Sequence, residues 1–398
     1  MCGIAGIITI KNSKIDSTVV ENVKRSLEHR GPDHSSHQFI KESVCLIHTR
    51  LSIIDLNDRS NQPFQSNDER YTIVFNGEIY NYKELRKELE TKGHKFITNG
   101  DTEVLLQGYI EYEEKILNKL RGQFAFVIYD KITNELFMAR DRIGIKPLYY
   151  SVNDNWILFG SEIKAIELSK LIEFEPDIDS YLAYLRHLCV PADSTGNKNI
   201  KKLEPGQFIR IDKNGKISKK IYWDPFTFSV NHDLNEKNVV EELDRLLNES
   251  VEYRKVSDVE VGLFLSGGLD SSLLGKLMNK NSDSSLKAFN VDFEENFEGY
   301  KGELKEARFA SSEIGINLNE EKINFDNFKE IFDNYAYYQD DLVGDEVGIP
   351  LYFLGKSSRS SGIKVVLVGE GSDELFYGYD HWNSCLLYTS DAADDNTC

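Results

Sequence analysis

The chain carries a cysteine at its second position, in the opening stretch MCGIAGIITI. If the initiator methionine is removed, Cys2 holds a thiol and a free α-amine on one residue, a nucleophile with its own base. The reference pKa values of both groups lie near about 8, so the amine can accept the thiol proton at neutral pH without a histidine. The alternative is an ordinary strand cysteine beside Ile4, Ile7 and Ile8.

Five further residues have types that suit attack on an amide. Such attack creates an oxyanion, for which Asn76 offers a side-chain NH₂ and Gly77 an open backbone N–H. Arg50 can bind a carboxylate through two parallel hydrogen bonds, and Glu78 and Asp101 can bind an ammonium group. Taken singly, these residues are more typical of a surface charge, a turn and an acidic helix start. They indicate a site only together with Cys2.

A second cluster begins with FLSGGLDSS, which follows an apolar stretch and precedes a helical pattern. Main-chain N–H groups at a helix start bind anions, and Gly267 and Gly268 let phosphates approach the backbone. The Gly-Lys-Ser/Thr ending of a Walker A loop is missing. The stretch therefore predicts a phosphate-binding loop of another kind.

An acidic loop, VGEGSDELF, follows the apolar stretch VVLV. We expect Asp270 of the glycine loop and Asp373 of the acidic loop to meet at one sheet edge. Mg²⁺ bound by one or two carboxylates and by substrate phosphates suits that arrangement. The alternative is a solvated acidic loop without a ligand.

The elements that position these residues change in kind along the chain. Up to about residue 205, helical spacings mix with paired strands and short turns, for example QFAFVIYD and ELFMARD. That pattern is typical of an α+β domain with antiparallel sheet. After about residue 230, strands alternate with helices, which predicts an α/β doubly wound parallel sheet.

Composition limits the classes of function. A length of 398 residues favours two domains, and a formal net charge of −19 argues against binding nucleic acid or an anionic membrane. We find neither a membrane-spanning stretch nor a signal peptide, and we expect a cytoplasmic protein. The five cysteines have no metal or disulfide spacing, and we expect Cys45 and Cys189 to be buried.

The first half resembles the glutaminase domain of the class II glutamine amidotransferases. The resemblance is carried by CGIAGI, RGPD, HTRLSIIDL, FNGEIYN, GDTEVLL and ARDRIGIKPLYY, in that order. It implies an N-terminal-nucleophile hydrolase fold, a four-layer αββα sandwich, and hydrolysis of glutamine by Cys2. It also implies that Asn76 and Gly77 form the oxyanion hole. Glutamine would be bound by Arg50, Asn76, Gly77, Glu78 and Asp101, while we assign structural roles to His29 and His48.

The second half resembles the asparagine synthetases, whose glycine loop is similar to that of the ATP pyrophosphatases. The resemblance implies ATP and Mg²⁺ as cofactors, with Asp270 and Asp373 as metal ligands and Glu370 as a catalytic residue near the reacting carboxylate. It implies an ATP site formed by Ser266, Gly267, Gly268, Asp270, Ser271, Val291, Val368 and Gly369. Val368 stands where the family often has serine.

Together the two halves resemble glutamine-hydrolysing asparagine synthetase. The implied reaction is ATP-dependent amidation of aspartate through an acyl-adenylate, with ammonia from glutamine and release of AMP and pyrophosphate. The expected partners are these small molecules, and not nucleic acid or a membrane; a homodimer is compatible with the sequence. In the segment 340–356 both prolines of the family pattern are missing, which leaves the acceptor open.

Three alternatives stay open. The enzyme can amidate another carboxylate, for example on a sugar or peptide of the cell envelope. It can be a phosphoribosyl or hexosamine amidotransferase, against which SGGLDSS argues because those enzymes cleave no ATP. It can also be a non-catalytic nucleotide-binding regulator, which the intact set of Cys2, Arg50, Asn76 and Asp101 disfavours.

The expected domains are a glutaminase domain at 2–205, a linker at 206–235 and an ATP-binding domain at 236–383. The residues from 384 to 398 read like translated adapter sequence, so we expect a non-native tail after an incomplete second domain. A chain of this length is therefore expected to hydrolyse glutamine and to make little or no asparagine.

Overall fold

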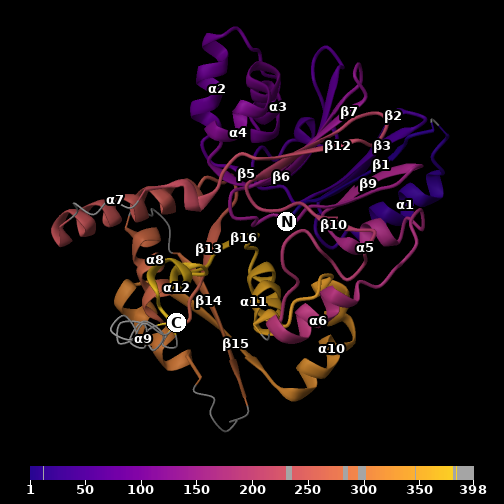
Figure 1. Ribbon diagram of the computed structural model, residues 1–398. Coiled ribbons are helices and arrows are strands. Elements are labelled where there is room, and N and C mark those ends of the chain that lie inside the picture. Colours follow the sequence, from indigo (N-terminus) through magenta and orange to yellow (C-terminus); the bar gives the residue numbers. More distant parts are fainter. Residues whose placement is uncertain are drawn as a thin grey trace, which may run out of the picture. The chain divides into compact units, whose positions relative to one another are not determined.

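The computed structural model describes residues 1–11, 13–229, 235–280, 286–294, 302–345, 347–379 and 382. It divides into two compact units (Figure 1). Unit 1 comprises Met1–Asn235 and Asp333–Glu346, and unit 2 comprises Glu236–Phe332 and Val347–Cys398. Among the described residues, no helix has the length and apolarity needed to cross a bilayer. The predicted tail at 384–398 lies outside the described residues.

Unit 1 contains two six-stranded sheets whose neighbouring strands pair antiparallel. The first has the order β10-β8-β9-β1-β3-β2 and the second β12-β11-β7-β6-β5-β4. The strands of the first sheet are β1 (Gly3–Thr9), β2 (His34–Lys41), β3 (Val44–Arg50), β8 (Tyr149–Val152), β9 (Trp156–Gly160) and β10 (Lys201–Lys202). Those of the second are β4 (Phe64–Gln65), β5 (Tyr71–Ile79), β6 (Gly122–Asp130), β7 (Glu135–Arg140), β11 (Gln207–Ile211) and β12 (Ile217–Ile221).

The main core of unit 1 lies between the two sheets. Alternate residues of β1 and β3, such as Ile4, Ile8 and Leu46, pack in one cluster with Val74 of β5 and Val127 of β6. Strand side chains alternate between faces, so each sheet contributes every second residue to this layer. Figure 1 shows the long strands of both sheets side by side.

Helices cover the outer faces of both sheets. The first sheet packs against α1 (Ser17–Ser26) and α5 (Ile163–Glu167), and the second against α3 (Asp101–Tyr112). The sandwich of helix, sheet, sheet and helix expected from the sequence is therefore confirmed. The other helices of the first stretch are α2 (Tyr82–Thr91), α4 (Ile116–Lys119) and α6 (Ile178–His187), with short 3₁₀ turns at η1 (Asp58–Ser60), η2 (Glu113–Lys115) and η3 (Pro225–Thr227).

The structure corrects the predicted linker at 206–235. Strands β11 and β12 lie within that range and form one side of the second sheet, where β11 pairs with β7. The flanking prolines and the polar composition suggested a linker. Phe208, Ile209 and Ile211 are nevertheless buried, because β11 lies between two other strands.

Unit 2 contains a four-stranded, fully parallel sheet in the order β15-β14-β13-β16. One face packs against α7, α8 and α9, and the other against α10 and α11. This confirms the predicted doubly wound sheet. Its elements are α7 (Glu236–Arg254), β13 (Val261–Phe264), α8 (Leu269–Asn279), β14 (Lys287–Phe293), α9 (Leu304–Ile314), β15 (Asn317–Ile323), α10 (Phe325–Gln339), α11 (Gly348–Ser360), β16 (Val365–Leu367) and α12 (Ser372–Phe376).

The strand order of unit 2 reverses between β13 and β16. Strands β13, β14 and β15 follow one another outward, whereas β16 lies on the other side of β13. In open parallel sheets, ligands bind at the carboxyl ends of the two strands where the order reverses. The glycine loop after β13 and the acidic loop after β16 both begin there.

Candidate active site

The candidate site of unit 1 is the polar end of the core between the sheets. Ile4 of β1, Leu46 of β3 and Val74 of β5 face that core. Because side chains alternate, Cys2 shares the face of Ile4, and Asn76 shares the face of Val74. The alternation of side chains along the strands thus directs Cys2 and Asn76, which are far apart in sequence, toward the layer between the two sheets.

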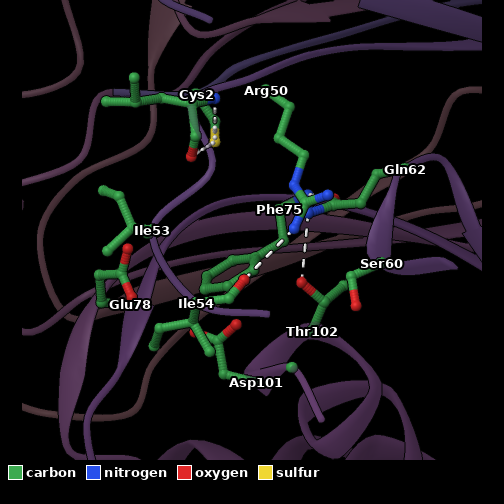
Figure 2. A pocket seen from close by; sticks show the side chains of 13 residues that line it. Cys2, Arg50, Ile53, Ile54, Ser60, Gln62, Phe75, Glu78, Asp101 and Thr102 are labelled. Carbon is green, nitrogen blue, oxygen red and sulfur yellow. Dashed lines mark hydrogen bonds between the residues drawn. The ribbon is translucent and has the colours of Figure 1, made fainter. Parts of the chain in front are cut away.

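A pocket of about 380 Å³, partly open to solvent, lies at this end. Figure 2 shows Cys2 and Arg50 on one side of the view and Glu78 and Asp101 on the other. The lining residues are Cys2, Arg50, Leu51, Ile53, Ile54, Ser60, Gln62, Phe75, Gly77, Glu78, Gly100, Asp101 and Thr102.

The Cys2 sulfur contacts the backbone of Leu51. The Leu51 N–H donates to the sulfur at 3.4 Å, and the Leu51 carbonyl lies 3.7 Å from it. Burial raises the pKa of the thiol, while the nearby chain-terminal ammonium and the contact with Leu51 act in the opposite direction. The Arg30 Nε donates to the Cys2 carbonyl at 2.9 Å, which fixes the main chain at Cys2.

Met1 precedes the nucleophile and lies beside two cations. Its thioether sulfur is 3.5 Å from the Lys146 Nζ and 3.9 Å from an Arg30 nitrogen. The Met1 side chain is 51% exposed, but burial lowers the pKa of its α-ammonium to about 6, assisted by repulsion from Arg30 and Lys146. The chain terminus therefore lies in surroundings that favour a neutral amine.

Arg50 is buried in the pocket wall and holds the loop that follows β3. Its two terminal nitrogens donate to the carbonyls of Ile54, Asp55 and Asn57 and to the Asn61 Oδ1. The predicted bond to a substrate carboxylate would have to be shared with these contacts. The structure thus gives Arg50 a role in shaping the pocket that its type alone did not reveal.

Asp101 is the first residue of α3 and is buried at the pocket floor. Its Oδ2 accepts from the Ile79 N–H at 2.9 Å. Burial raises the pKa of Asp101 to about 6, and the backbone N–H groups at the helix start limit the increase. An ammonium ligand beside Asp101 would favour the charged form of this carboxylate.

The side chain of Asn76 is buried, and its Nδ2 has no hydrogen-bond partner among the described residues. A buried donor without a partner is costly, and such groups occur where a ligand completes the bond. Gly77 follows with a φ of +155°, and a Cβ there would lie 2.1 Å from the Gln123 carbonyl oxygen. Only glycine fits this position.

His48 and His29 lie near the site, and each contacts protein groups. The His48 Nε2 is 3.2 Å from the Phe75 carbonyl, and burial lowers the pKa of His48 to about 3. The ring is therefore neutral and holds the strand that bears Asn76. His29 pairs with Glu162 at 2.9 Å. Both contacts agree with the structural roles predicted for these residues.

Of the site residues predicted for unit 1, Cys2, Arg50, Gly77, Glu78 and Asp101 line the pocket, whereas Asn76 is not among the lining residues. Gln62 was not predicted: its Oε1 accepts from the Phe75 N–H at 2.7 Å and its Nε2 donates to Thr102 at 3.2 Å (Figure 2). In the sequence, Gln62 is a glutamine beside a proline in a polar loop, and this pattern is too common to indicate a site residue.

Two cysteine predictions had different outcomes. Cys45 is buried in the core, as expected. The prediction of a buried Cys189 is wrong, because this residue is exposed. It comes directly after the left-handed Leu188 that ends α6, a position at the surface of the unit.

The candidate site of unit 2 begins with the loop Ser266–Gly268. Gly267 has a φ of +89°, and a Cβ there would lie 2.3 Å from the Glu306 carbonyl carbon. Ser266 and Ser271 are linked through their hydroxyls at 2.9 Å across the start of α8. The loop is thus narrow, glycine-dependent and open at the helix N-terminus.

Asn290 of β14 supports the same loop from below. Its Nδ2 donates to the Leu265 carbonyl at 2.8 Å, while its buried Oδ1 has no partner among the described residues. Val291, the predicted contact for adenine, points to the opposite face of the sheet and packs near Phe353. Asn290 was not predicted, because a polar residue inside a strand gives no signal of the loop that it holds.

The acidic loop lies against the glycine loop within unit 2. A Cβ on Gly369 would be 3.3 Å from the Asp270 Cβ and from the Ser271 nitrogen. Burial and repulsion by Asp373 raise the pKa of Asp270, so these two carboxylates are close. Val368 and Glu370 flank Gly369 and are exposed.

The described residues include no group of three or more His, Cys, Asp or Glu side chains placed to hold a metal. A cation at Asp270 and Asp373 would therefore need further oxygen ligands, such as water or phosphate.

Comparison with known proteins assigns the chain. Residues 1–223 match the family model described as "Glutamine amidotransferase domain", and residues 242–395 match that described as "Asparagine synthase". Glutamine-hydrolysing asparagine synthetase 1 of Bacillus subtilis is 38% identical over 389 residues, 97% of this chain and 60% of that protein.

Two further relatives have slightly lower sequence identity to this chain. The protein named as putative glutamine-hydrolysing asparagine synthetase 2 of Methanocaldococcus jannaschii is 34% identical, over 95% of this chain and 76% of its own length. A fungal protein, amidase chry2 of Gibberella zeae, is 33% identical over 98% of this chain and 61% of its own length. The chain thus spans about 60% of the length of the B. subtilis relative and 76% of the archaeal one. With both family matches in this order, the chain belongs to the family of glutamine-hydrolysing asparagine synthetases.

Proposed function

We propose that unit 1 hydrolyses glutamine and that the ammonia serves an ATP-dependent amidation of a carboxylate, aspartate first among the candidates. The observation that carries the proposal is the pocket of unit 1. It is lined by the Cys2 thiol, by two carboxylates and by an arginine, and the lining residue Gly77 directly follows Asn76, whose buried Nδ2 has no hydrogen-bond partner among the described residues. These groups match the γ-amide, α-ammonium and α-carboxylate of glutamine.

In the proposed reaction, Met1 is first removed, so that the amine of Cys2 becomes free. This amine takes the thiol proton, and the sulfur attacks the γ-amide carbon. Asn76 Nδ2 and the Gly77 N–H stabilise the oxyanion. As the oxyanion collapses, the leaving NH₂ group takes the proton from the amine and departs as ammonia, and a thioester remains on Cys2. Water then hydrolyses the thioester to glutamate and restores the thiol.

Substrate recognition divides between the two sides of the pocket. Glu78 and Asp101 bind the α-ammonium, and Arg50 binds the α-carboxylate while holding its own loop. Gln62 and Phe75 shape the wall between them. A ligand with all three groups completes the site, whereas a simple amide leaves both ends unsatisfied.

In unit 2, the glycine loop and the acidic loop would bind ATP at the carboxyl ends of β13 and β16. ATP supplies the adenylate that makes a carboxylate reactive toward ammonia. Ser266, Gly267, Gly268, Ser271 and Gly369 would hold its phosphates and ribose. Val368 and Val291 would flank the base, and Val291 is the weaker of the two because it packs on the other face.

Asp270 and Asp373 are the carboxylates that would hold Mg²⁺. Repulsion between these carboxylates is part of what raises the pKa of Asp270, and a cation would remove that repulsion. ATP phosphate oxygens would complete the coordination. Glu370, exposed next to this pair, is proposed to act near the reacting carboxylate.

Two observations concern the carboxylate that accepts the ammonia. The first two carboxylates of the segment 340–356 contact residues of unit 1: Asp340 lies beside Lys164, and Asp341 beside Lys202. They are therefore poor candidates for binding a free acceptor. A relative named as an amidase also favours a test of other carboxylates. The cytoplasmic location and the homodimer remain predictions from the sequence.

The test is a two-part assay on protein whose loss of Met1 is checked by intact mass. Release of glutamate from glutamine is measured first, with Cys2→Ala as the control. Pyrophosphate release is then measured with ATP, Mg²⁺ and a panel of carboxylic acids. We expect Cys2-dependent glutamate, and pyrophosphate release that depends on one class of carboxylic acid would identify the acceptor. Glutamate formation that survives in Cys2→Ala contradicts the role of the pocket.

A further inference from the structure

The stretch that matches the asparagine synthase description contains a segment that belongs structurally to unit 1. Residues 333–346 lie within the matched range 242–395, yet they cluster with the first unit. Gly344 donates to the Leu188 carbonyl at 2.7 Å, and Val343 forms a β-bridge with Cys189. We refer to residues 333–345 as the returning segment.

Asp340 of the returning segment binds the start of α5. Its carboxylate accepts from the Ile163 N–H and, at 3.0 Å, from the Lys164 N–H. The Lys164 ammonium lies 3.4 Å from the same carboxylate and donates to the Tyr337 carbonyl at 2.6 Å. The returning segment therefore supplies two hydrogen-bond acceptors to Lys164.

The contacts continue from Lys164 to the nucleophile. Lys164 pairs with Glu162 at 2.5 Å, and Glu162 pairs with Arg30 at 2.8 Å. Arg30 donates through Nε to the Cys2 carbonyl at 2.9 Å. A continuous series of ion pairs thus runs from Asp340 to the main chain of Cys2.

This series is buried. The side chains of Asp340, Lys164, Glu162 and Arg30 are 7%, 11%, 6% and 9% exposed. Buried charges are stable only when paired, and removal of one partner leaves the next charge uncompensated. Glu162 is shared by Lys164, Arg30 and His29. Loss of the Asp340 charge leaves Glu162 as the only carboxylate in this series, so Lys164 competes more strongly with Arg30 for it.

We propose that Asp340 is a positioning residue for the nucleophile, acting through the buried ion pairs that end on the Cys2 carbonyl. This inference rests on the proposed glutaminase function of the pocket. It adds that unit 1 obtains part of its active-site support from sequence more than 300 residues further along the chain. Substitutions in the synthase stretch are then expected to alter glutamine hydrolysis.

The neighbouring Asp341 provides a matched control. Its carboxylate accepts from the Tyr149 hydroxyl at 2.9 Å and pairs with Lys202 at 2.7 Å. It anchors the same segment to the same unit, but none of these contacts leads to Arg30. A general loss of docking would affect both variants, whereas a positioning role affects only Asp340.

The experiment compares Asp340→Asn and Asp341→Asn in the full chain. For Asp340→Asn we expect kcat for glutamine to fall about tenfold with KM changed less than about twofold, because the nucleophile moves while the binding groups stay. For Asp341→Asn we expect both constants to stay within about twofold. Equal losses of kcat in the two variants overturn the proposal.

A second readout does not need glutamine. Iodoacetamide modification is followed by peptide mapping at Cys2 and at the fully buried Cys45. We expect Asp340→Asn to modify Cys2 faster than Asp341→Asn does, with Cys45 unmodified in both. Equal rates at Cys2 overturn the positioning role even if the parent protein hydrolyses no glutamine, a result that would count against the proposed function alone.

Reaction at Cys45 in Asp340→Asn would indicate unfolding. The comparison then uses Asp340→Glu and Asp341→Glu, which keep the charge and displace it by one methylene. Positioning predicts a loss of kcat of about threefold or more only at residue 340. Equal values at both positions reject it.

Discussion

The two candidate sites differ in how completely the protein forms them. The pocket of unit 1 has buried walls: Arg50, Gln62 and Asp101 are 5%, 5% and 6% exposed. The loops of unit 2 are open, and Gly268 and Glu370 are exposed. A site between two sheets is preorganised by the core that it terminates. A site made of loops at a sheet edge needs its ligand to complete the coordination and to neutralise like charges.

The two sites also differ in what raises the pKa of their carboxylates. In unit 1, burial alone raises the pKa of Asp101 to about 6. In unit 2, repulsion by Asp373 adds to a modest burial at Asp270. In the proposed function, Asp101 is paired by the ammonium group of the substrate, and Asp270 is paired by a metal cation.

Removal of the nucleophile should have the largest effect and should separate the two sites. Cys2→Ala is expected to reduce glutamine hydrolysis by about four orders of magnitude or more, because no other group can form the thioester. Nucleotide binding by unit 2 should be unchanged. Glutamate release and ATP binding by calorimetry provide the two measurements, and a parallel loss of both would show that the sites are not independent.

Asn76→Ala tests the unpartnered donor. Loss of one oxyanion donor typically costs about 10²–10³ in kcat, with little change in KM. Asn76→Ala also removes a buried Nδ2 that has no partner among the described residues, so the melting temperature should not fall by as much as for a deletion of paired groups. Steady-state kinetics and thermal unfolding check both statements. A lower affinity with unchanged kcat would assign Asn76 to binding instead.

Gly267→Ala tests whether the open site still depends on backbone geometry. The positive φ and the contact with the Glu306 carbonyl carbon both exclude a side chain. We expect ATP affinity to fall about thirtyfold or more, since strain of this kind costs about 1–3 kcal/mol and displaces the loop.

Gly268→Ala is the matched control for that prediction. Its nearest atom beyond its chain neighbours would be the Ser266 Oγ at 3.4 Å, and its φ of −66° suits any residue. A loss of less than about threefold is expected. Similar losses in both variants would indicate that the loop does not bind phosphate through its backbone.

The pH dependence of KM for glutamine should show the smallest effect. Asp101 has a raised pKa, so it loses charge as the pH falls through about 6 and then binds an ammonium poorly. At pH 5 we expect KM to be up to about tenfold higher than at pH 7.5, with the substrate opposing the change. The sign is fixed: affinity increases with pH.

Asp101→Asn should remove that pH dependence and leave a high KM throughout. The raised pKa also means that ionisation of Asp101 destabilises the fold, so its contribution to stability is present at low pH and is lost as the pH rises through about 6. A pH profile of KM that is identical in parent and variant would assign ammonium binding to Glu78 alone.

Much of the candidate site of unit 1 could be predicted because its residues lie in strands and at strand ends. Cys2, Arg50, Asn76 and Glu78 lie an even number of residues from the core residues Ile4, Leu46 and Val74, so their direction follows from the alternation of side chains. Gly77 was predicted for its conformational freedom, and its environment requires glycine. The doubly wound sheet was predictable for a similar reason, since apolar strands alternate with amphipathic helices.

The predictions failed where long-range pairing outweighed local composition. The polar, proline-flanked stretch at 206–221 forms two strands of a sheet because β7 offers an unpaired edge to β11. Cys189 was expected to be buried from its residue type, but it follows a helix end at the surface. No local signal reports which edge or surface a segment will meet.

By itself, the sequence determined the chemistry that is available: a thiol near the chain start, donors and charges at spacings suited to an amino-acid amide, and a glycine loop between a strand and a helix. The tertiary structure decided which of these groups meet. It alone showed that Arg50 holds its own loop, that the buried Asn76 Nδ2 has no hydrogen-bond partner among the described residues, and that ion pairs lead from Asp340 to Arg30, which binds the Cys2 carbonyl. The reason is physical, because alternation and turn chemistry act over a few residues, whereas burial, ion pairing and hydrogen-bond satisfaction depend on segments that only folding brings together.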